Sequence, residues 1–346
     1  MSEGTCIRFA HSSENRKSKI QNRKWVGYLV IALMVLGWLR VAEAQQPGKL
    51  YRIGTLESGV PAARGEGWQA FRQGLRELGY VEGKNITLEQ RWGEGKGRER
   101  LEALANELVR LKVDVIVTAA TGAALAAKKA RSTIPIVMAS QSDPVGIGLV
   151  ASLAKPGGNV TGLSSMNVEL GGKRLEILNE AFPNVSRVVF LRALQSQSLQ
   201  VNEVERAARS LGVQLQIVHS RPEEFEAAFL TVAKTRAEAL IVGAAPNFIA
   251  HRTRLVELAA KARLPIIYPD WEYVEAGGLM SYGIIRTELF RRAAYYVDRI
   301  LKGAKPAELP VEQPQKFGLV ISLKTAKALD LTIPAQVLLA ADRVIK

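Results

Sequence analysis

Short apolar runs alternate with segments of helical periodicity along most of this chain, and this alternation limits the fold more than any other feature. Over residues 51–163, the runs expected to form strands are 51–56, 86–92, 114–118, 135–139 and 159–163. The segments expected to form helices there are 67–78, 98–111 and a stretch that begins at Thr121. Because strands that alternate with helices of this length form βαβ units, these residues predict a parallel sheet covered by helices on both faces.

The same alternation begins again after residue 163. Its expected strands are 187–191, 213–218, 239–242, 265–268, 278–283 and 317–322. Its expected helices are 172–181, 199–211, 223–235, 251–262 and 288–301, followed by two short C-terminal helices. The two sets together have too many strands for one sheet, and 346 residues with 47% hydrophobic content can form two cores. We therefore predict an α/β fold with two similar lobes.

Residues 1–44 show the three-part pattern of a secretory signal peptide. A basic segment from Arg16 to Lys24 precedes the apolar run 25–39, and the small residues Ala42 and Ala44 follow it. The alternative is an uncleaved transmembrane anchor, but the apolar run is short for a membrane span. We therefore expect cleavage after Ala44 and export to the periplasm.

Cysteine and charge exclude further classes of protein. The single cysteine, Cys6, lies in the predicted signal peptide, so the exported chain can form no disulfide and has no thiol nucleophile. Residues 1–44 hold 7 Lys+Arg and 3 Asp+Glu, so residues 45–346 hold 40 against 30, and this net charge of +10 is spread along the predicted helices and is not gathered in one run. Because an exported protein rarely meets nucleic acid, we attribute the charge to solubility and expect no nucleic-acid partner.

Small polar residues follow three strands of the first predicted sheet. The candidate site residues at these strand ends are Glu57, Ser58, Thr121, Gly122, Ala123, Ser140, Asp143 and Pro144. The C-terminal ends of parallel strands share one edge of a sheet, where open α/β folds bind ligands, so we expect these residues to converge. Each segment alone is also explained as a turn or a cap, with Thr121 and Asp143 as helix N-caps.

The alanine-rich helix at Thr121 offers a further interpretation. The first N–H groups of a helix have no partner within it, and this end carries a partial positive charge. We predict that the hydroxyl of Thr121 and the N–H groups of Thr121, Gly122 and Ala123 bind a ligand carboxylate or a similar acceptor.

Asn247, Tyr268 and Trp271 follow two strands of the second predicted set. An aromatic side chain at the edge of a cleft can stack on a small organic ligand, although ordinary packing explains Tyr268 and Trp271 equally well. We retain all three as candidate ligand contacts.

The sequence lacks the common motifs of nucleotide, metal and hydrolase sites. Residues 54–59 do not match G-x-G-x-x-G, and no Gly-Lys-Ser/Thr follows Thr121. After residue 44, His219 and His251 are the only histidines, without zinc-site spacing, and no G-x-S-x-G motif is present. We therefore predict no cofactor, no metal and no catalytic residue.

Four longer stretches resemble a bacterial family of ABC-transporter substrate-binding proteins. They read YVEGKNITLEQRW at 80–92, DPVGIGLVASLAKPGGNVTGLSS at 143–165, AGGLMSYG at 276–283 and PQKFGLVISLKTAKALDLTIP at 314–334. The resemblance covers residues 51–346, and the family includes relatives associated with tryptophan and other aromatic amino acids.

This resemblance implies two Rossmann-like lobes with parallel sheets, in the type I periplasmic-binding fold, with three crossovers and a ligand cleft between the lobes. It implies a first lobe of residues 50–163 plus 285–312 and a second of 164–284 plus 313–346. The candidate residues would then contact a small-molecule ligand from both lobes. A protein of this family would act as a monomer that delivers its ligand to an ABC permease and its ATPase, and would meet the membrane only through the permease.

Two departures from the family pattern fall on the second lobe. Residues 192–197 replace an Asn-Pro turn that many relatives have. Residues 244–246 read Ala-Ala-Pro and lack the acidic residue that relatives often have before the proline at this position. We therefore expect a small, carboxylated ligand that can differ from those of the relatives, with amino acids and aromatic compounds as candidates. The alternative function is an α/β enzyme that acts on a small carboxylated substrate. A transcription regulator would need a helix-turn-helix where the signal peptide is predicted.

Overall fold

The computed structural model describes residues 49–61, 65–130, 133–167, 169–194 and 199–346. All helices and strands reported below lie in one compact unit, Leu50–Lys346. The predicted signal peptide, its cleavage site and Cys6 lie outside the described residues. Within the part of the chain that the structure describes, every helix is too short or too polar to span a membrane.

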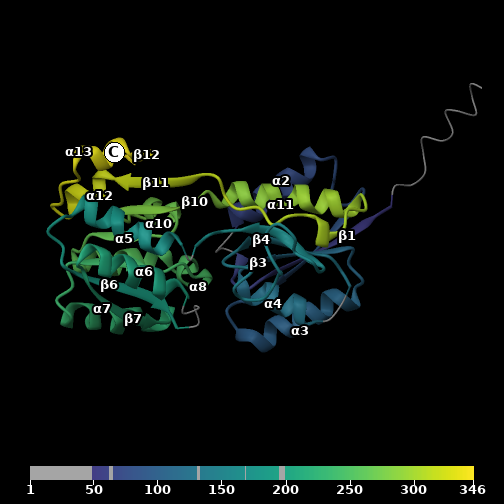
Figure 1. Cartoon of the computed structure of the whole chain (residues 1–346), viewed down its shortest axis with the longest axis horizontal. Helices are drawn as coiled ribbons and strands as arrows, with labels where there is room; N and C mark the ends of the chain where they lie inside the picture. Colours follow the sequence, from purple (N-terminus) through teal and green to yellow (C-terminus); the bar gives the residue numbers. More distant parts are fainter. Residues whose placement is uncertain (1–48, 62–64, 131–132, 168, 195–198) are drawn as a thin grey trace, which may run out of the picture. The chain divides into compact units, whose positions relative to one another are not determined.

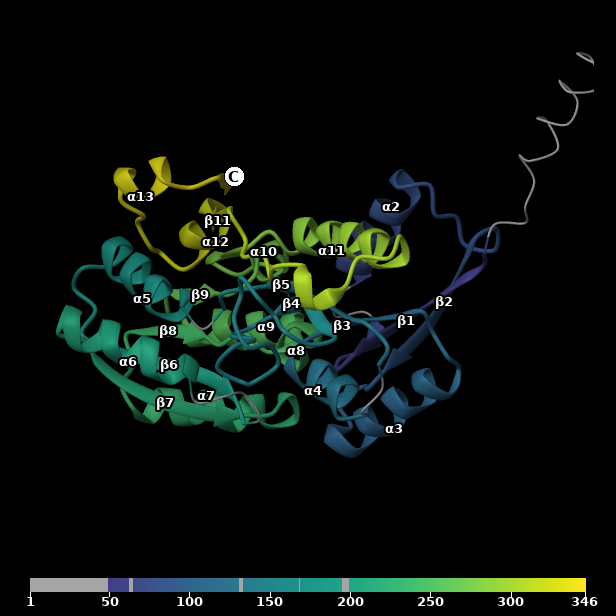
Figure 2. The ribbon, with the colours of Figure 1, turned by 45° about the vertical axis from the view of Figure 1, so that its right-hand side comes forward.

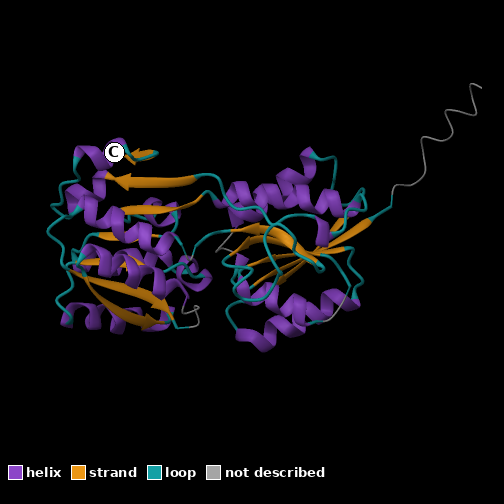
Figure 3. Ribbon diagram, in the orientation of Figure 1, coloured by secondary structure: helices purple, strands orange, loops and turns teal. Residues whose placement is uncertain are grey.

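The first sheet has five parallel strands among the described residues, in the order β2-β1-β3-β4-β5 (Figure 1). Its strands are β1 (Tyr51–Glu57), β2 (Ile86–Trp92), β3 (Val115–Ala119), β4 (Ile136–Gln141) and β5 (Val160–Ser164). Helices α2 (Gly65–Glu77) and α11 (Arg286–Leu301) lie on one face, and α3 (Gly97–Arg110) and α4 (Thr121–Lys129) lie on the other (Figure 3). We call this sheet with its helices the first lobe.

Strand periodicity gives the first lobe a core on each face of its sheet. In β3, Val115 and Val117 pack with α2 and α11, whereas Ile116 packs with α3 and α4. Successive side chains of a strand point to opposite faces, so an uninterrupted apolar run is buried on both. The rings of Trp68 and Phe290, which join α2 to α11, meet edge to face with their centroids 5.0 Å apart.

The second sheet has seven strands among the described residues, in the order β12-β11-β10-β9-β8-β6-β7 (Figure 2). These are β6 (Arg187–Ala193), β7 (Gln214–Ser220), β8 (Ala239–Val242), β9 (Ile266–Tyr268), β10 (Met280–Ile284), β11 (Phe317–Ser322) and β12 (Arg343–Ile345). One face packs on α5 (Leu170–Ala181), α6 (Leu199–Leu211), α12 (Leu323–Ala328) and α13 (Ala335–Leu339). The other packs on α7 (Phe225–Lys234), α8 (Pro246–Ala250), α9 (Arg252–Ala262) and α10 (Trp271–Glu275). We call this sheet with its helices the second lobe; the short 3₁₀ helices η3 (Pro222–Glu224) and η4 (Pro306–Glu308) complete the elements.

The described chain passes between the lobes three times. It leaves the first lobe after β5 and returns to it between β10 and α11. Glu312 still pairs with Leu163 of the first lobe in a β-bridge, and the chain crosses for the third time between Glu312 and the start of β11. The chain leaves β10 toward the first lobe, and it enters β11 on its way back from that lobe. The two neighbouring strands are therefore antiparallel. Among the strand pairs that the structure describes, this one departs from the parallel pairing expected from the sequence.

The predicted α/β fold with two sheets is confirmed, and most elements lie within two residues of their predicted bounds. The short elements α8, α10 and β12 were not predicted. The exact lobe boundaries, 50–163 plus 285–312 and 164–284 plus 313–346, remain a prediction.

Candidate functional site

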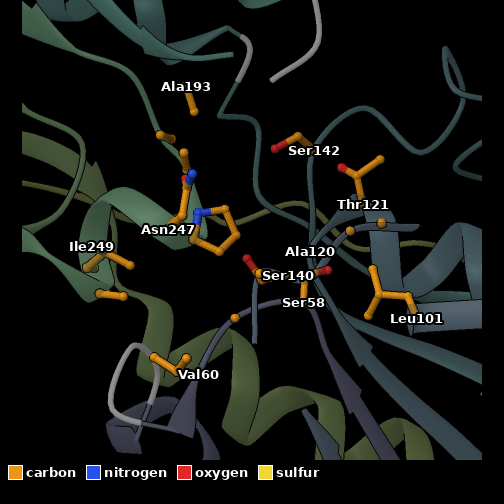
Figure 4. Close-up of a pocket in the computed structure, with 18 of the residues that line it drawn as sticks. Ser58, Val60, Leu101, Ala120, Thr121, Ser140, Ser142, Ala193, Asn247 and Ile249 are labelled. Atoms are coloured by element: carbon orange, nitrogen blue, oxygen red, sulfur yellow. The ribbon is translucent and has the colours of Figure 1, made fainter. Parts of the chain in front are cut away.

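A cavity of about 1160 Å³ is lined by residues of both lobes (Figure 4). On the first lobe the lining comes from the chain after each of the five strands and from helices α3 and α4. On the second lobe it comes from α6, α8 and η3 and from the chain after β6, β7, β8 and β9. Its polar, uncharged side chains are Ser58, Thr121, Ser140, Ser142, Ser165, Asn167, Gln200 and Asn247. The strand ends that the sequence singled out therefore do meet at one place.

The loop after β1 is shaped by Glu57 and presents Ser58 to the cavity. Glu57 is buried outside the lining, and its Oε1 accepts hydrogen bonds from the N–H groups of Ser58 at 2.9 Å and Gly59 at 3.3 Å. The hydroxyl oxygen of Ser58 is itself buried and has no hydrogen-bond partner among the described residues. Because leaving a buried hydroxyl unpaired costs free energy, Ser58 is suited to bind a polar atom of a ligand.

Helix α4 begins at the cavity without a side-chain cap. Its N-cap is Ala120, and no side chain among the described residues satisfies its first N–H groups. Ala120 has φ 69° and ψ 154°, a conformation that is almost restricted to glycine. Thr121 and Gly122 follow it in the cavity lining. The open end of α4 thus presents N–H groups and a partial positive charge to the cavity.

The N-cap role considered for Thr121 is wrong, because Thr121 is already the first residue of the helix. Its hydroxyl oxygen instead accepts a hydrogen bond from Nε2 of Gln141 at 2.7 Å. A hydroxyl that accepts one bond can still donate its own hydrogen. Thr121 can therefore donate to an acceptor atom in the cavity.

The ends of β3 and β4 are irregular where they reach the cavity. The register of β3 against β4 shifts after Thr118, and that of β4 against β5 shifts between Met138 and Gln141. Such irregularities change the direction in which the following side chains point. Ser140 and Ser142 both line the cavity, and Oγ of Ser142 lies 3.1 Å from Oγ of Ser165.

Asp143 and Pro144, which come next, form a turn outside the cavity lining. Oδ1 of Asp143 accepts a hydrogen bond from the N–H of Gly146 at 2.8 Å, and the Pro144 carbonyl accepts one from the N–H of Leu149 at 2.9 Å. Since the residues after Pro144 form turns and no helix, Asp143 stabilises a turn where a helix N-cap was considered.

The second lobe contributes a group of apolar residues to the lining, beside the polar residues Gln200, Arg221, Glu223, Asn247, His251 and Asp270. The apolar residues are Ala193, Leu194, Ala244, Ala245, Pro246, Ile249 and Ala250. Asn247 lies beside them in α8, and Figure 4 shows it across the cavity from Thr121 and Ser142. The two sides of the cavity therefore differ: hydroxyls and the N–H groups of α4 lie on the first lobe, and the apolar group lies on the second.

Two aromatic candidates of the second lobe lie outside this lining. Tyr268 is buried and stacks on Tyr273 with the ring centroids 4.8 Å apart, and burial raises its pKa. Trp271 is the first residue of α10 and is partly exposed. The structure gives Tyr268 the packing role that the sequence left open.

An ion cluster lies where α11 begins. Nη2 of Arg286 is 2.6 Å from Oδ1 of Asp270 and 3.0 Å from Oε1 of Glu272. The side chains are 7%, 16% and 16% exposed, and Arg286 and Asp270 line the cavity. Burial opposes the charge of Arg286, but the two carboxylates more than offset it and raise its pKa.

Two neighbours of this cluster have shifted pKa values. Burial raises the pKa of Glu272 to about 7, although the charge of Arg286 acts in the opposite direction. Arg174 is wholly buried, where its Nε donates to the Tyr282 carbonyl at 2.7 Å, and burial lowers its pKa to about 10. Arg174 stays charged at neutral pH and adds a positive field at Asp270. Among the described residues, no three His, Cys, Asp or Glu side chains gather as metal ligands would.

Five of the eleven predicted site residues line the cavity: Ser58, Thr121, Gly122, Ser140 and Asn247. Six lie outside the lining: Glu57, Ala123, Asp143, Pro144, Tyr268 and Trp271. Contact of any of them with a ligand remains a prediction. Several polar lining residues were not among those predicted: Ser142, Ser165, Asn167, Gln200, Asp270 and Arg286. Ser142 and Asp270 are polar residues beside predicted ones at the ends of strands, so the same criterion could have found them. Arg286 lies before the helix expected at 288–301, where no strand end drew attention to it.

Comparison with known proteins agrees with this architecture. A family model described as ABC transporter substrate binding protein matches residues 62–345. A tyrosine-binding protein of Clostridioides difficile (strain R20291) is 27% identical over 268 residues, which cover 76% of each chain.

Two solved structures are similar over 86% of this chain and 100% of their own, each with a TM-score of 0.79. One is an ABC domain from Streptococcus pneumoniae in complex with L-Trp, at 29% identity. The other is a conserved domain protein from Vibrio cholerae O1 biovar El Tor strain N16961, at 28% identity.

These similarities confirm the resemblance and the type I periplasmic-binding fold. The function that they support is solute capture for ABC transport, and they do not favour the enzyme considered as an alternative. Because the family model matches most of the length of this chain, the chain belongs to the family of ABC transporter substrate-binding proteins.

Proposed function

We propose that this protein captures a small carboxylate with an apolar, aromatic-sized body and delivers it to the permease and ATPase of an ABC importer. One observation carries the proposal: the open end of α4 and the hydroxyls of Ser58, Thr121 and Ser140 line one side of a cavity, and an apolar group that includes Ala244, Ala245 and Ile249 lies on the other side. Relatives named for tyrosine and L-Trp support a ligand of this size.

Magnitudes assign different tasks to the two sides of the cavity. A carboxylate at a helix N-terminus gains about 0.3–2 kcal/mol, whereas a Kd of about 1 μM requires roughly 8 kcal/mol. Burial of about 200 Å² of apolar ligand surface contributes about 5 kcal/mol. The first lobe therefore orients the carboxylate, and the apolar lining of the second lobe supplies much of the affinity.

A thermal-shift screen of the purified protein tests the ligand class. The panel contains amino acids, aromatic acids and short aliphatic acids, each beside the amide of the same carbon skeleton. A carboxylate that binds the folded state raises the melting temperature, and its amide, which lacks the charge, raises it less. Equal shifts with acid and amide would contradict a carboxylate site.

Small-angle scattering tests whether the lobes close on the ligand. Contacts from both sides of the cavity favour a closed state, so the radius of gyration is expected to fall when the best ligand of the screen is added. An unchanged radius at saturation would argue against closure.

Export is the localisation that we propose, and it has its own test. After expression of the full chain in a Gram-negative host, the protein is expected in the periplasmic fraction with Gln45 as its N-terminal residue. N-terminal sequencing that finds residues 25–39 still attached would refute cleavage after Ala44.

The enzyme alternative is tested with the same ligands. The proposal expects each binding acid to be recovered unchanged by chromatography after long incubation with the protein. Product formed in proportion to protein concentration would favour the enzyme.

A further inference from the structure

Building on the proposed function, we propose that the ligand is a carboxylate without an ammonium group, such as an aromatic or aliphatic acid, and that the cavity selects against the corresponding amino acids. This inference concerns the charge that stands beside the ligand carboxylate. It rests on how the acidic groups of the cavity are already paired.

The described acidic residues that line the cavity are Glu94, Glu102, Asp270 and Glu223. The first two are paired, since Glu94 lies 2.6 Å from Nζ of Lys96 and Glu102 lies 2.7 Å from both Lys129 and Arg98. Glu223 is exposed on η3. The undescribed residues 62–64, 131–132, 168 and 195–198 include no Asp or Glu.

Asp270 is the partly buried acid of the lining, and Arg286 already pairs with it. The two side chains are 2.6 Å apart, with exposures of 16% for Asp270 and 7% for Arg286. Arg174, which is wholly buried, adds a second positive field at Asp270. An ammonium group placed there would meet two guanidinium groups and would compete with Arg286 for Asp270.

On the second lobe, the acid that lines the cavity besides Asp270 is Glu223, whose charge is screened by solvent because it is exposed. The lining of Ala193, Ala244, Ala245 and Ile249 on this lobe is hydrocarbon, and Asn247 supplies an uncharged amide. A buried cation needs a charged or strongly polar partner, whereas an aromatic or aliphatic body is stabilised by such a surface. The cavity therefore fits one negative head group on an apolar body.

Calorimetric titration of matched pairs tests the inference on the unmodified protein. The pairs are 3-phenylpropanoate with L-phenylalanine and 3-(indol-3-yl)propanoate with L-tryptophan, which differ only in the ammonium group. In at least one pair the acid without nitrogen is expected to bind at least tenfold more tightly, a difference of about 1.4 kcal/mol. Equal or tighter binding of the amino acid in either pair would overturn the inference while leaving the proposed function intact. If no member of either pair binds, the aromatic carboxylate class fails and the inference fails with it.

A pair of variants at Ala244 provides a second test. Ala244→Asp adds a carboxylate to the second-lobe lining, and Ala244→Asn has almost the same size without the charge. Ala244→Asp is expected to raise the affinity for the amino acid relative to its nitrogen-free partner by at least tenfold, and Ala244→Asn is not. If both variants change this ratio equally, charge does not set the selectivity and the inference is wrong. Melting curves of both variants confirm that they fold.

Discussion

Thr121 and Gln141 tie the first turn of α4 to the end of β4. Nε2 of Gln141 donates to the Thr121 hydroxyl at 2.7 Å and to the carbonyl of Ser142 at 2.9 Å. Gln141 is buried, so its amide holds the Thr121 side chain in one orientation with the hydroxyl hydrogen free to donate. Thr121 thus belongs to a preformed hydrogen-bond network at the cavity.

Thr121→Val removes this hydroxyl while nearly keeping its shape. A hydrogen bond to a charged group contributes about 1.5–3 kcal/mol, so carboxylate affinity is expected to fall between about tenfold and a hundredfold. Thr121→Ser keeps the hydroxyl and is the matched control. The measurement is calorimetric titration beside a melting curve. A lower melting temperature with unchanged affinity would mean that Thr121 serves only to hold Gln141.

Gly122→Val tests how closely a ligand approaches α4. A Cβ at Gly122 would lie 3.1 Å from Cδ1 of Leu101 and 3.3 Å from Oγ of Ser58, so a branched side chain has to extend into the cavity. We expect affinity to fall at least tenfold while the protein still folds, as checked by calorimetry and circular dichroism. Gly158→Val is the control, because a Cβ there meets open space away from the cavity. Full affinity in Gly122→Val would show that the ligand binds elsewhere.

Ala120→Gly tests the backbone strain before α4. The conformation of Ala120, with φ 69° and ψ 154°, costs about 1–3 kcal/mol for a residue with a Cβ. Glycine removes this strain, but its greater conformational freedom stabilises the unfolded chain by about 0.5–1 kcal/mol. The variant is therefore expected to be more stable by about 1 kcal/mol. Urea unfolding measures the difference. A loss of stability would mean that this conformation is not strained.

The sequence predicted the sheets well because their strands are long apolar runs. The predicted bounds 86–92, 239–242 and 317–322 are those of β2, β8 and β11. The missed elements α8, α10 and β12 have five residues or fewer, too short for a periodic pattern to develop. Strand direction is not encoded in such patterns, so the antiparallel pairing of β11 depended on where the chain returned from the first lobe.

The site was predicted at the level of strand ends but not of individual side chains. Glu57 and Ser58 are adjacent, yet Glu57 turns to the backbone of its own loop and Ser58 lines the cavity. The register shifts near Ala119 and Gln141 likewise change the directions in which the following side chains point, and the spacing of residues in the sequence does not reveal this. Arg286 was missed because its carboxylate partners are 14 and 16 residues away in the chain, so the three meet only in the folded protein.

Glu272 is expected to make the stability of the protein depend on pH. Its pKa is about 7 in the folded state, against 4.5 as its ordinary value, mainly because it is buried. The groups that face it are Arg286, Asp270 and Glu66. The folded protein therefore binds more protons at this residue than the unfolded chain between pH 4.5 and 7. This contribution to stability is fully present below about pH 4.5 and is lost as pH rises through 7.

Glu272→Gln, which resembles the protonated form, should lack this contribution. Its free energy of unfolding minus that of the unmodified protein is expected to rise by about 1–3 kcal/mol between pH 5 and pH 8. Urea unfolding without ligand at pH 5, 6, 7 and 8 measures this difference. Glu275→Gln is the control in the same helix, since its ion pair with Arg343 is about half exposed and should contribute less than about 1 kcal/mol throughout. If the curves for Glu272→Gln and the unmodified protein stay parallel, the carboxyl of Glu272 does not titrate in this range.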